Sequence, residues 1–595
     1  MNSEQFRAAG AKMVDYAIEY METINKREPL PHVVPGWLAK VMPPQAPVKG
    51  EPFENIFNDF EKVVMEGTTH WMHPQFASYF PAGNTWPSIL GAILSNAVGV
   101  NGTTWESCPA VTELEMIMAD WVGKMMGIPK FFWTVFSNPE TEGGGCIQTS
   151  ASDAILLGMI SAREDCVRSL RIKYPNVPRA VLLNRMVAYR SSQCHSSVER
   201  AGLIGYMRVR PLPADELGNV RARTLREAIK EDMKNSLIPY LYVAVLGSTG
   251  TCAFDDLMEI GPVCQDFGMW LHVDSAYAGS CYACPEMRYL SKGMEYAWSL
   301  NTNMNKWMLT NFDLSFLWLR YREKLAGPMT GYDDTRIHTP YWPIIELKYF
   351  GTPATRRFRA LKMWFVLRNY GISGMQKYHR NHILQSKVFE RYVERDERFE
   401  VVGPTRVGLC CFRLRGTNDI NNKLLEAINA SRRLHMVPSY FHEKFVIRYA
   451  PVYQFLTEED VATSWRITDE FATAMIHQYI RDGTDAALLK PLFDLQAYYD
   501  EQHKAHPDEQ WDREETAAET FVTSHEHEKI VDFFAMSAKD GSYGDAGDDE
   551  DKTYDGYLKS HPEALRREEI RGQPKVTDKV PSMLRMEIRE KAAKK

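Results

Sequence analysis

The sequence predicts an α/β protein with a large domain built on a mostly parallel sheet, followed by a smaller α+β domain and a polar tail. In the large domain, apolar runs such as VLLNRMVAYR, PYLYVAVLGSTGT and GMWLHVDSAYAG alternate with amphipathic helical stretches. That alternation is typical of parallel strands covered by helices on both faces. The runs RFEVVG, GLCCFRLRG and KFVIRYAPV predict the strands of a second sheet. After them, hydrophobicity falls and charges gather in blocks.

These patterns divide the chain into four regions. Residues 1–85 form an N-terminal helical segment interrupted by Pro-rich connections, and residues 86–375 form the large α/β domain. Residues 376–485 form the small C-terminal α+β domain. Residues 486–595 form a charged tail with an acidic, Gly-rich run, and this composition predicts that the tail is largely disordered.

Composition argues against two classes of partner. The chain is 44% hydrophobic and 25% charged, without a run of ~20 apolar residues, so we expect no membrane span. A net charge of −7 gives no electrostatic basis for binding nucleic acid. The N-terminus lacks the apolar core of a signal peptide, and this predicts a cytoplasmic protein.

The cysteine pattern gives little support for a metal site. Of the ten cysteines, Cys281 and Cys284 have CxxC spacing, but neither a second such pair nor a histidine partner lies nearby in the sequence. Buried structural thiols are therefore favoured over a zinc or redox site, and we expect no metal.

A carboxylate follows the apolar strand GMWLHV. Asp274 stands at the carboxyl end of this strand, the edge at which ligands bind in open α/β sheets. Aspartate in such a position is also a common helix cap or turn residue. Both interpretations remain open for Asp274 alone.

A lysine occurs in the next apolar segment, AWSLNTNMNKWMLT. Lys306 is an ordinary snorkelling lysine if its amine reaches solvent. If it is buried, its pKa is lowered and the amine becomes a nucleophile for Schiff-base formation.

A Gly-rich turn opens a helix in the first part of the large domain. Gly143-Gly144-Gly145 leads to Ser150, Ala151 and Ser152, and then to the helical run AILLGMISAR. Free backbone N–H groups at such a helix start can hold a phosphate, although a simple Ser N-cap explains the same residues. It is not a Walker loop, because no Gly-Lys-Ser/Thr follows.

Taken together, the three features indicate one cofactor. A phosphate cradle, a carboxylate for a pyridinium nitrogen and an amine for an aldehyde are what pyridoxal 5′-phosphate (PLP) needs. The carboxylate keeps the ring nitrogen protonated, so the ring can accept electrons from a carbanion. The sequence therefore predicts a PLP enzyme with Lys306 and Asp274 at its centre.

The sequence resembles the group II PLP-dependent decarboxylases, in the branch of the aromatic-L-amino-acid and histidine decarboxylases. The resemblance covers residues 1 to about 485, and the tail lies outside it. Its most specific stretches are MVDYAIEYM, PGWLAKVMP, THWMHPQFASYFPAGNTWPS, QCHSSVERAGLIG, HVDSAYAGS, NMNKW and RRFRALKMWFV.

The resemblance implies a fold, an activity and a set of roles. The fold is that of the PLP-dependent transferases of type I, with a seven-stranded sheet and a homodimeric assembly. The activity is the conversion of an aromatic L-amino acid such as tyrosine, DOPA or 5-hydroxytryptophan to its biogenic amine and CO₂. Lys306 would bind PLP covalently, Asp274 would pair with its ring nitrogen, and His195 would stack on the ring and help to protonate the substrate carbon. The remaining cofactor contacts would be Ala151, Ser152, Thr249 and Asn303.

The chain departs from the family pattern near the cofactor. Met304-Asn305 stand where the family has Pro-His, and Ser275 stands where it has Ala. The mobile loop that usually supplies a catalytic tyrosine is shorter here. Tyr332 is the expected catalytic tyrosine of this loop, and Tyr341 is the weaker candidate.

The substrate pocket departs as well. The resemblance implies a pocket lined by Tyr79, Pro81, Ala82, Asn101, Thr103 and Thr355. Asn101 and Thr103 replace the Ile and Phe of aromatic decarboxylases, which disfavours a large apolar ring. Three alternatives therefore stay open: a histidine decarboxylase, a decarboxylation-dependent aromatic aldehyde synthase, and a catalytically weak PLP-binding dimer.

Overall fold

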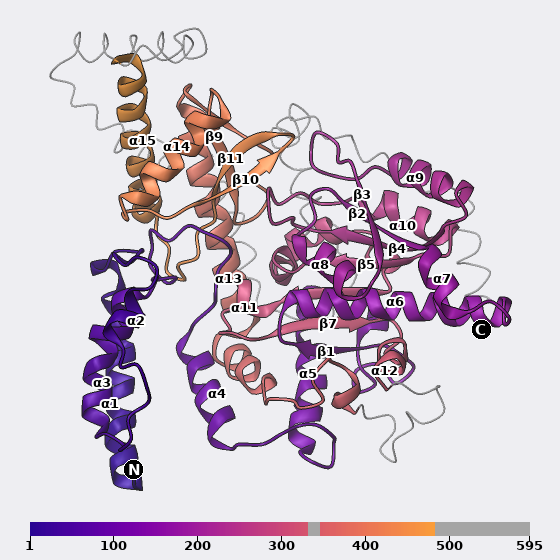
Figure 1. The fold of residues 1–595 in the computed structure, drawn as a ribbon, viewed down its shortest axis with the longest axis horizontal. Helices are drawn as coiled ribbons and strands as arrows, with labels where there is room; N and C mark the ends of the chain where they lie inside the picture. Colours follow the sequence, from indigo (N-terminus) through magenta and orange to yellow (C-terminus); the bar gives the residue numbers. More distant parts are fainter. Residues whose placement is uncertain (331–345, 482–595) are drawn as a thin grey trace.

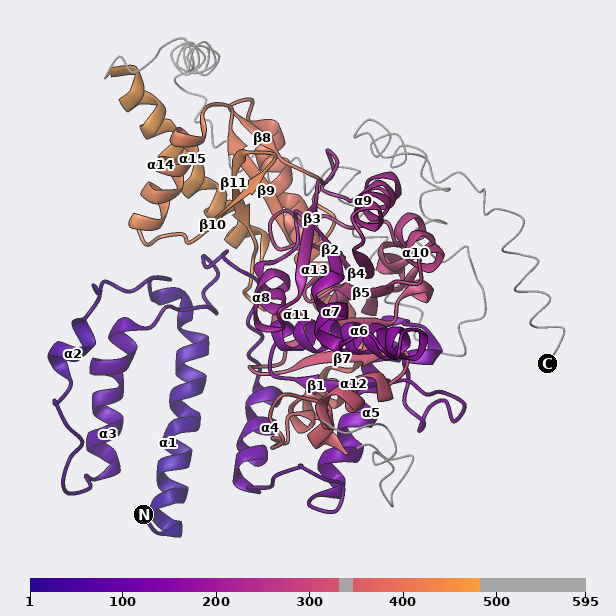
Figure 2. The same cartoon turned by 45° about the vertical axis from the view of Figure 1, so that its right-hand side comes forward.

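The computed structural model describes residues 1–330 and 346–481, which form three parts (Figure 1). An N-terminal helical segment stands beside the two sheet-containing domains, and a change of view by 45° keeps it separate (Figure 2). Its helices are α1 (Ser3–Glu22), α2 (Trp37–Val41) and α3 (Phe53–Asp59). Helix α1 begins at a capping box, in which the Asn2 side chain and the Gln5 side chain each accept from the other's backbone N–H.

The large domain is built on a seven-stranded sheet with the order β1-β7-β6-β5-β4-β2-β3. All neighbouring strands are parallel except the two pairs that β7 makes, which are antiparallel. The expected mostly parallel seven-stranded sheet is therefore confirmed. The strands are β1 (Gly144–Gln148), β2 (Met186–Ser191), β3 (Arg208–Leu212), β4 (Ile238–Val245), β5 (Trp270–Asp274), β6 (Ser299–Asn303) and β7 (Ser315–Leu319).

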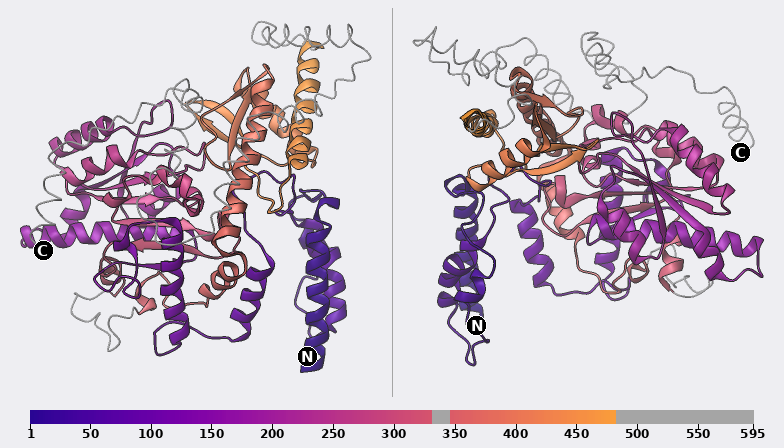
Figure 3. Two further views of the ribbon diagram at one scale, coloured as in Figure 1. Left: turned by 180° about the vertical axis from the view of Figure 1, so that it is seen from behind. Right: turned by 45° about the horizontal axis from the view of Figure 1, so that its top comes forward.

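Helices cover both faces of this sheet, which explains why the central strands β5 and β6 are buried along their whole length. One layer consists of α6 (Ala151–Lys173), α7 (Arg179–Arg185), α8 (Ser196–Ile204) and α12 (Glu323–Thr330). The opposite layer includes α5 (Pro109–Met126), α9 (Ala222–Lys234) and α10 (Leu257–Asp266). Figure 3 shows the same domain from behind and with its top tilted toward the viewer.

The large domain is connected to the small domain through helix α13 (Ala360–Arg395), on which helix α4 (Trp86–Ala97) packs. Helix α13 runs on into the small domain. The predicted boundary between residues 375 and 376 falls inside α13, close to a bend at Gly371, whose φ of 65° is unfavourable for other residues. Two helical segments that meet at the kink at Gly371 therefore join the two domains.

The small domain has an antiparallel sheet with the order β10-β11-β9-β8. Its elements are β8 (Phe399–Val401), β9 (Cys410–Leu414), α14 (Asn418–Ala430), β10 (Val437–Phe441), β11 (Lys444–Tyr449) and α15 (Glu458–Arg481). Phe389 of α13 stacks on Tyr449 with ring centroids 3.8 Å apart, so α13 is part of this domain's core. The predicted tail, 486–595, lies outside the described residues.

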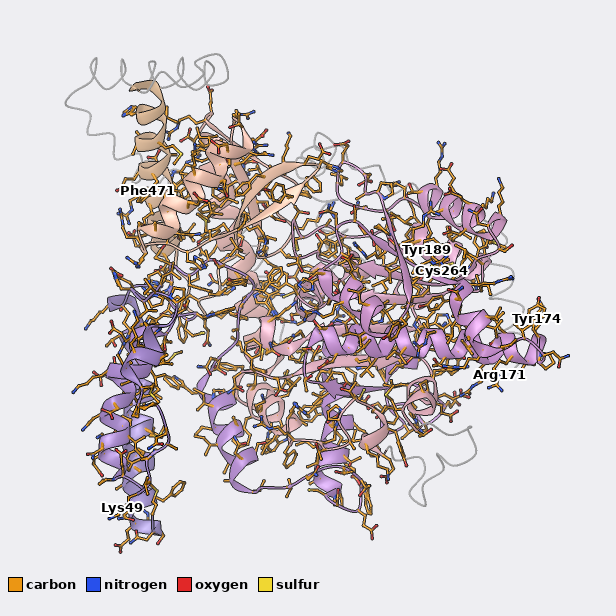
Figure 4. The ribbon with its side chains drawn as sticks, viewed as in Figure 1. Lys49, Arg171, Tyr174, Tyr189, Cys264 and Phe471 are labelled. Atoms are coloured by element: carbon orange, nitrogen blue, oxygen red, sulfur yellow. The ribbon has the colours of Figure 1, made fainter. Side chains whose placement is uncertain are left out.

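In residues 1–330 and 346–481, no helix combines the length and the apolar character that crossing a bilayer requires. Figure 4 shows the side chains of Arg171 and Tyr174 at the C-terminal end of α6.

Candidate active site

Lys306 lies on α11 (Met304–Trp307), a single helical turn that directly follows β6. The Asn303 side chain caps this turn by accepting from the Asn305 N–H at 3.1 Å. The Lys306 amine is partly buried and has no hydrogen bond or ion pair to any described residue; it lies 5.4 Å from the centre of the Phe80 ring. Burial lowers the pKa of Lys306, whereas Asp274 acts in the opposite direction. An amine of this kind is suited to Schiff-base formation.

Asp274 is the last residue of β5, and its side chain is only 5% exposed. Its Oδ1 accepts from Asn301 Nδ2 at 3.0 Å and from the Ala276 N–H at 3.1 Å. No described residue donates to Oδ2, so one carboxylate oxygen remains for a further donor. This arrangement fits a protonated ring nitrogen.

The start of α6 has the free amides that a phosphate needs. Ser150 caps the helix by accepting from the Asp153 N–H at 3.1 Å. The backbone N–H groups of Ala151 and Ser152, in the first turn, have no acceptor within the helix. These amides and the positive end of the helix dipole fit a phosphate group.

The sheet topology brings this helix start to the Lys306 side. Strand β7 is antiparallel to both neighbours, so β1 and β6 point the same way. Gln148 at the end of β1 and Asn303 at the end of β6 both pair with Ser315. Thr249 follows β4 at the same edge, because β4, β5 and β6 are parallel.

His195 is the N-cap of α8, beside both charged groups. Its Nδ1 accepts from the Ser197 N–H at 3.1 Å and lies 2.9 Å from the Ser197 hydroxyl. Because Nδ1 accepts from a backbone N–H, the proton of the neutral ring is on Nε2. Partial burial and the nearby Lys306 lower the pKa of His195, which favours the neutral form. The residue as a whole is exposed to solvent.

The segment that contains Tyr79, Pro81 and Ala82 passes next to α11. The Gly83 N–H donates to the Asn305 carbonyl at 2.9 Å, and Phe80 contacts Lys306 as described above. The Tyr79 ring is 49% exposed and stacks on Trp71, with centroids 5.0 Å apart.

The other expected pocket residues form a separate cluster. Asn101 Oδ1 accepts from Thr103 Oγ1 at 2.9 Å and from the Arg356 N–H at 3.0 Å, next to Thr355. Asn101 and Thr355 are exposed, and among the described contacts none joins this cluster to Lys306. In Figure 1 the loop between α4 and α5 that carries Asn101 lies at the lower edge, away from α11. Within one chain, therefore, the expected pocket is divided.

Five further residues were singled out from the sequence: two tyrosines, one asparagine and two cysteines. Tyr332 and Tyr341 lie outside the described residues. Asn305, one of the departures from the family pattern, is buried and its Oδ1 accepts from the Leu314 N–H at 3.0 Å. Cys281 and Cys284 are fully buried, and burial raises the pKa of both thiols.

Arg448, which lies on β11 of the small domain, is a site residue that was not expected from the sequence. Its guanidinium is 3% exposed and lies 5.1 Å from the centre of the Phe80 ring. Nη2 donates to the Tyr79 carbonyl at 3.1 Å, whereas Nε is buried and no residue of 1–330 or 346–481 accepts from it. This positive charge also lowers the pKa of Lys306. The available signal was a lone arginine in the apolar run KFVIRYAPV.

Comparisons with known proteins agree with this geometry. Residues 35–415 match the family described as the pyridoxal-dependent decarboxylase conserved domain. Aromatic-L-amino-acid decarboxylase of Mus musculus is 42% identical over 479 residues, covering 80% of this chain and 99% of that protein. Histidine decarboxylase of Drosophila melanogaster is 40% identical, covering 80% of this chain and 56% of that protein.

A solved structure gives the same result for the fold. The Catharanthus roseus tryptophan decarboxylase in complex with L-tryptophan superposes with a TM-score of 0.75 at 31% identity, covering 80% of this chain and 99% of that one. PLP is therefore the cofactor that the Lys306 amine, the free Asp274 oxygen and the α6 amides accommodate. The chain belongs to the family of pyridoxal-dependent decarboxylases.

Proposed function

We propose that this enzyme decarboxylates an aromatic L-amino acid such as tyrosine, DOPA or 5-hydroxytryptophan, releasing the biogenic amine and CO₂. The observation that carries the proposal is that Lys306 and His195 lie near the same carboxylate, Asp274, whose charge acts on the pKa of both. Bound PLP supplies an electron sink for the pair of electrons left when CO₂ departs. Relatives of this chain that are named aromatic-L-amino-acid decarboxylases support the choice of substrate.

Each residue has a separate task in this proposal. Lys306 would anchor the cofactor, and Asp274 would keep its ring nitrogen charged. Ala151, Ser152, Thr249 and Asn303 would hold it around its phosphate. His195, through its Nε2–H, would supply the proton that the substrate carbon needs after CO₂ is lost.

Arg448 is suited to the substrate carboxylate. The guanidinium is buried, and its Nε has no acceptor in the part of the chain that the structure describes; a carboxylate would supply both a negative charge and that acceptor. Binding there would also orient the carboxylate relative to the cofactor, and orientation determines which bond to the α-carbon breaks.

The active enzyme is proposed to be a homodimer. Helix α4 exposes Trp86, Leu90, Ile93 and Leu94, whose spacing puts them on one face. The loop after this helix carries Asn101 and Thr103, which are remote from Lys306 of the same chain. A second copy docked on α4 would cover the apolar face and bring this loop to a site that is incomplete without it.

Sedimentation analysis tests the assembly. The wild type should sediment as a dimer, and Leu90→Glu combined with Ile93→Glu should produce monomers with little activity. Ile172→Glu, at a position on α6 that is 79% exposed, is the matched control and should stay dimeric. A fully active wild-type monomer would refute the dimer.

The reaction is tested by supplying PLP and a panel of amino acids to the purified enzyme. We expect an aromatic amine and CO₂ in equal amounts. Histamine as the main product would indicate a histidine decarboxylase, and aldehyde with peroxide and ammonia would indicate an aldehyde synthase. No turnover despite bound PLP would indicate a catalytically weak PLP-binding dimer.

A cytoplasmic location is proposed as well. All ten cysteines are free thiols, as expected of a protein that folds in a reducing compartment. Cell fractionation that recovered the enzyme with secreted or membrane markers would contradict this.

A further inference from the structure

A continuous chain of buried side chains leads away from Asp274 across two strands. It runs from Trp270 through Ser299, His272 and Asn301 to Asp274. In the parallel pair of β5 and β6, His272 is in register with Ser299, and Asp274 with Asn301. Since alternate residues of a strand share a face, all five side chains lie on one face of the sheet. None of them is more than 5% exposed.

The direction of every hydrogen bond in this chain follows from the carboxylate. A carboxylate only accepts, so Asn301 turns its Nδ2 toward Asp274, at 3.0 Å. Asn301 Oδ1 then faces His272 Nε2 at 2.9 Å, and Nε2 must carry the proton.

The far half of the chain has the same direction. Trp270 Nε1 can only donate, and it donates to Ser299 Oγ at 2.8 Å. The Ser299 hydroxyl therefore donates to His272 Nδ1 at 2.7 Å, since Nδ1 of the neutral ring accepts. All four donors thus point toward Asp274, and such aligned bonds strengthen one another.

The chain operates with a neutral His272. Burial lowers the pKa of this histidine to about 4, although Asp274 acts in the opposite direction. A protonated ring would turn Nδ1 into a donor and reverse its bond with Ser299.

Helix α6 is fitted to the same ring. A Cβ added at Gly158 would lie 2.7 Å from His272 Nδ1, so only glycine leaves room for the imidazole. This helix begins at Ala151 and Ser152, the residues suited to the phosphate. The helix that presents these amides therefore also packs, two turns later, against the histidine that is linked to Asp274.

We propose that His272 is a positioning residue that acts through Asn301 to hold Asp274 Oδ1, leaving Oδ2 aimed at the cofactor's ring nitrogen. The inference rests on the proposed function, because it needs Asp274 as the partner of that nitrogen. A purely structural role is the competing explanation, but burying five polar side chains is costly when apolar ones could fill the same layer.

Cofactor binding and its spectrum test the proposal. His272→Phe keeps a planar ring but removes both ring nitrogens. We expect it to weaken PLP binding by about 10-fold or more, because Asp274 loses the hydrogen-bond chain that holds its carboxylate. In His272→Phe, the visible absorbance band of the bound cofactor should also depend on pH differently from that of the wild type. His272→Gln restores the donor toward Asn301 and should recover most of the affinity.

A matched control lies in the same sheet. Tyr189 of β2 is fully buried and donates to Asp232 at 2.8 Å; Figure 4 labels it on the side of α9. Tyr189→Phe removes a comparable hydrogen bond to a carboxylate and should leave PLP affinity and the absorbance profile within about 2-fold of wild type. Thermal unfolding of the cofactor-free variants reports any loss of fold.

A double-mutant cycle separates positioning from general stabilisation. In an Asp274→Asn background, His272→Phe should weaken PLP binding by less than about 2-fold, because the group through which it acts has already changed. Full additivity would overturn the proposal, and so would wild-type affinity and spectrum in His272→Phe. If His272→Phe does not fold, Ser299→Ala takes its place and should shift the absorbance profile in the same direction. A wild type that binds no PLP would instead refute the proposed function.

Discussion

Arg448 and Tyr79, 369 residues apart in the sequence, are joined by a 3.1 Å hydrogen bond from the guanidinium Nη2 to the tyrosine carbonyl. The bond links β11 of the small domain to the segment that borders Lys306. Among the described residues, Nε of this deeply buried cation has no hydrogen-bond partner. This relationship gives the first of five predictions.

Arg448→Met should impair substrate use far more than cofactor binding. Losing a buried partner of the carboxylate costs about 2–5 kcal/mol, so kcat/KM should fall by at least ~30-fold. Steady-state decarboxylation measures this, and the PLP dissociation constant serves as the control. Arg448→Lys keeps the charge but not the planar, two-pronged hydrogen-bonding geometry of the guanidinium. Its kcat/KM should therefore lie between those of the wild type and Arg448→Met. An unchanged kcat/KM in Arg448→Met would show that Arg448 does not bind the substrate carboxylate.

Lys306→Ala should abolish the covalent adduct that borohydride reduction traps. Lys306 is the amine that burial prepares for Schiff-base formation, with no hydrogen bond among the described residues to compete. Mass spectrometry of a digest after reduction locates the adduct. Lys362, whose amine donates to the Asn311 and Phe312 carbonyls, is the control, and Lys362→Met should keep the adduct on Lys306. An adduct that persists in Lys306→Ala would identify another anchor.

His195→Asn should shift the products from amine toward aldehyde. The substitution removes the Nε2–H that we expect to protonate the substrate carbon, so molecular oxygen can react there instead, yielding aldehyde, peroxide and ammonia. The ratio of peroxide to amine measures the change. An unchanged ratio would show that another group, such as Tyr332, supplies the proton alone.

Stability should fall as the pH drops from about 6.5 toward 4. Burial lowers the pKa of His73, His272 and His382 to about 4, whereas the unfolded chain binds protons near pH 6.5. Unfolding therefore takes up protons between these pH values. Each histidine lowers the free energy of unfolding by about 2 kcal/mol at pH 5. Urea unfolding at pH 7.5 and pH 5.0 measures the difference; equal unfolding free energies would contradict the prediction.

Truncation after residue 505 should leave kcat/KM within about 2-fold of the full chain, because the family match ends at 415 and α15 ends at Arg481. Truncation after Leu456 is the contrasting control. It removes α15, which contributes Trp465 and Ile476 to the small-domain core, and should yield unfolded protein. Loss of activity in the longer truncation would mean that the tail takes part in catalysis or assembly.

The architecture and the centre of the site were predictable because their signals are local in sequence. Apolar runs of strand length alternate with helical patterns throughout the large domain, and this periodicity alone indicates a parallel sheet between helices. Asp274 and Lys306 each follow such a run, so their position at the sheet edge follows from strand direction. The α6 start is equally local, since Ser150 and the residues after it form the cap themselves.

The pocket residues behave differently. Asn101, Thr103 and Thr355 were expected beside the cofactor through the family resemblance, yet within one chain they form a separate cluster in which Asn101 and Thr355 are exposed. Which chain supplies a residue to a site is decided by surfaces that meet, and no local pattern in a single sequence records that.

Sequence by itself determined which side chains have the chemistry: an amine, a carboxylate and a helix start, each identified by its immediate neighbours. Only the tertiary structure decided what supports them. Arg448 reaches Tyr79 from another domain, and His272 reaches Asp274 through a residue of the adjacent strand. Strand order and register arise from packing of the whole sheet, so contacts that depend on them appear only when the chain has folded.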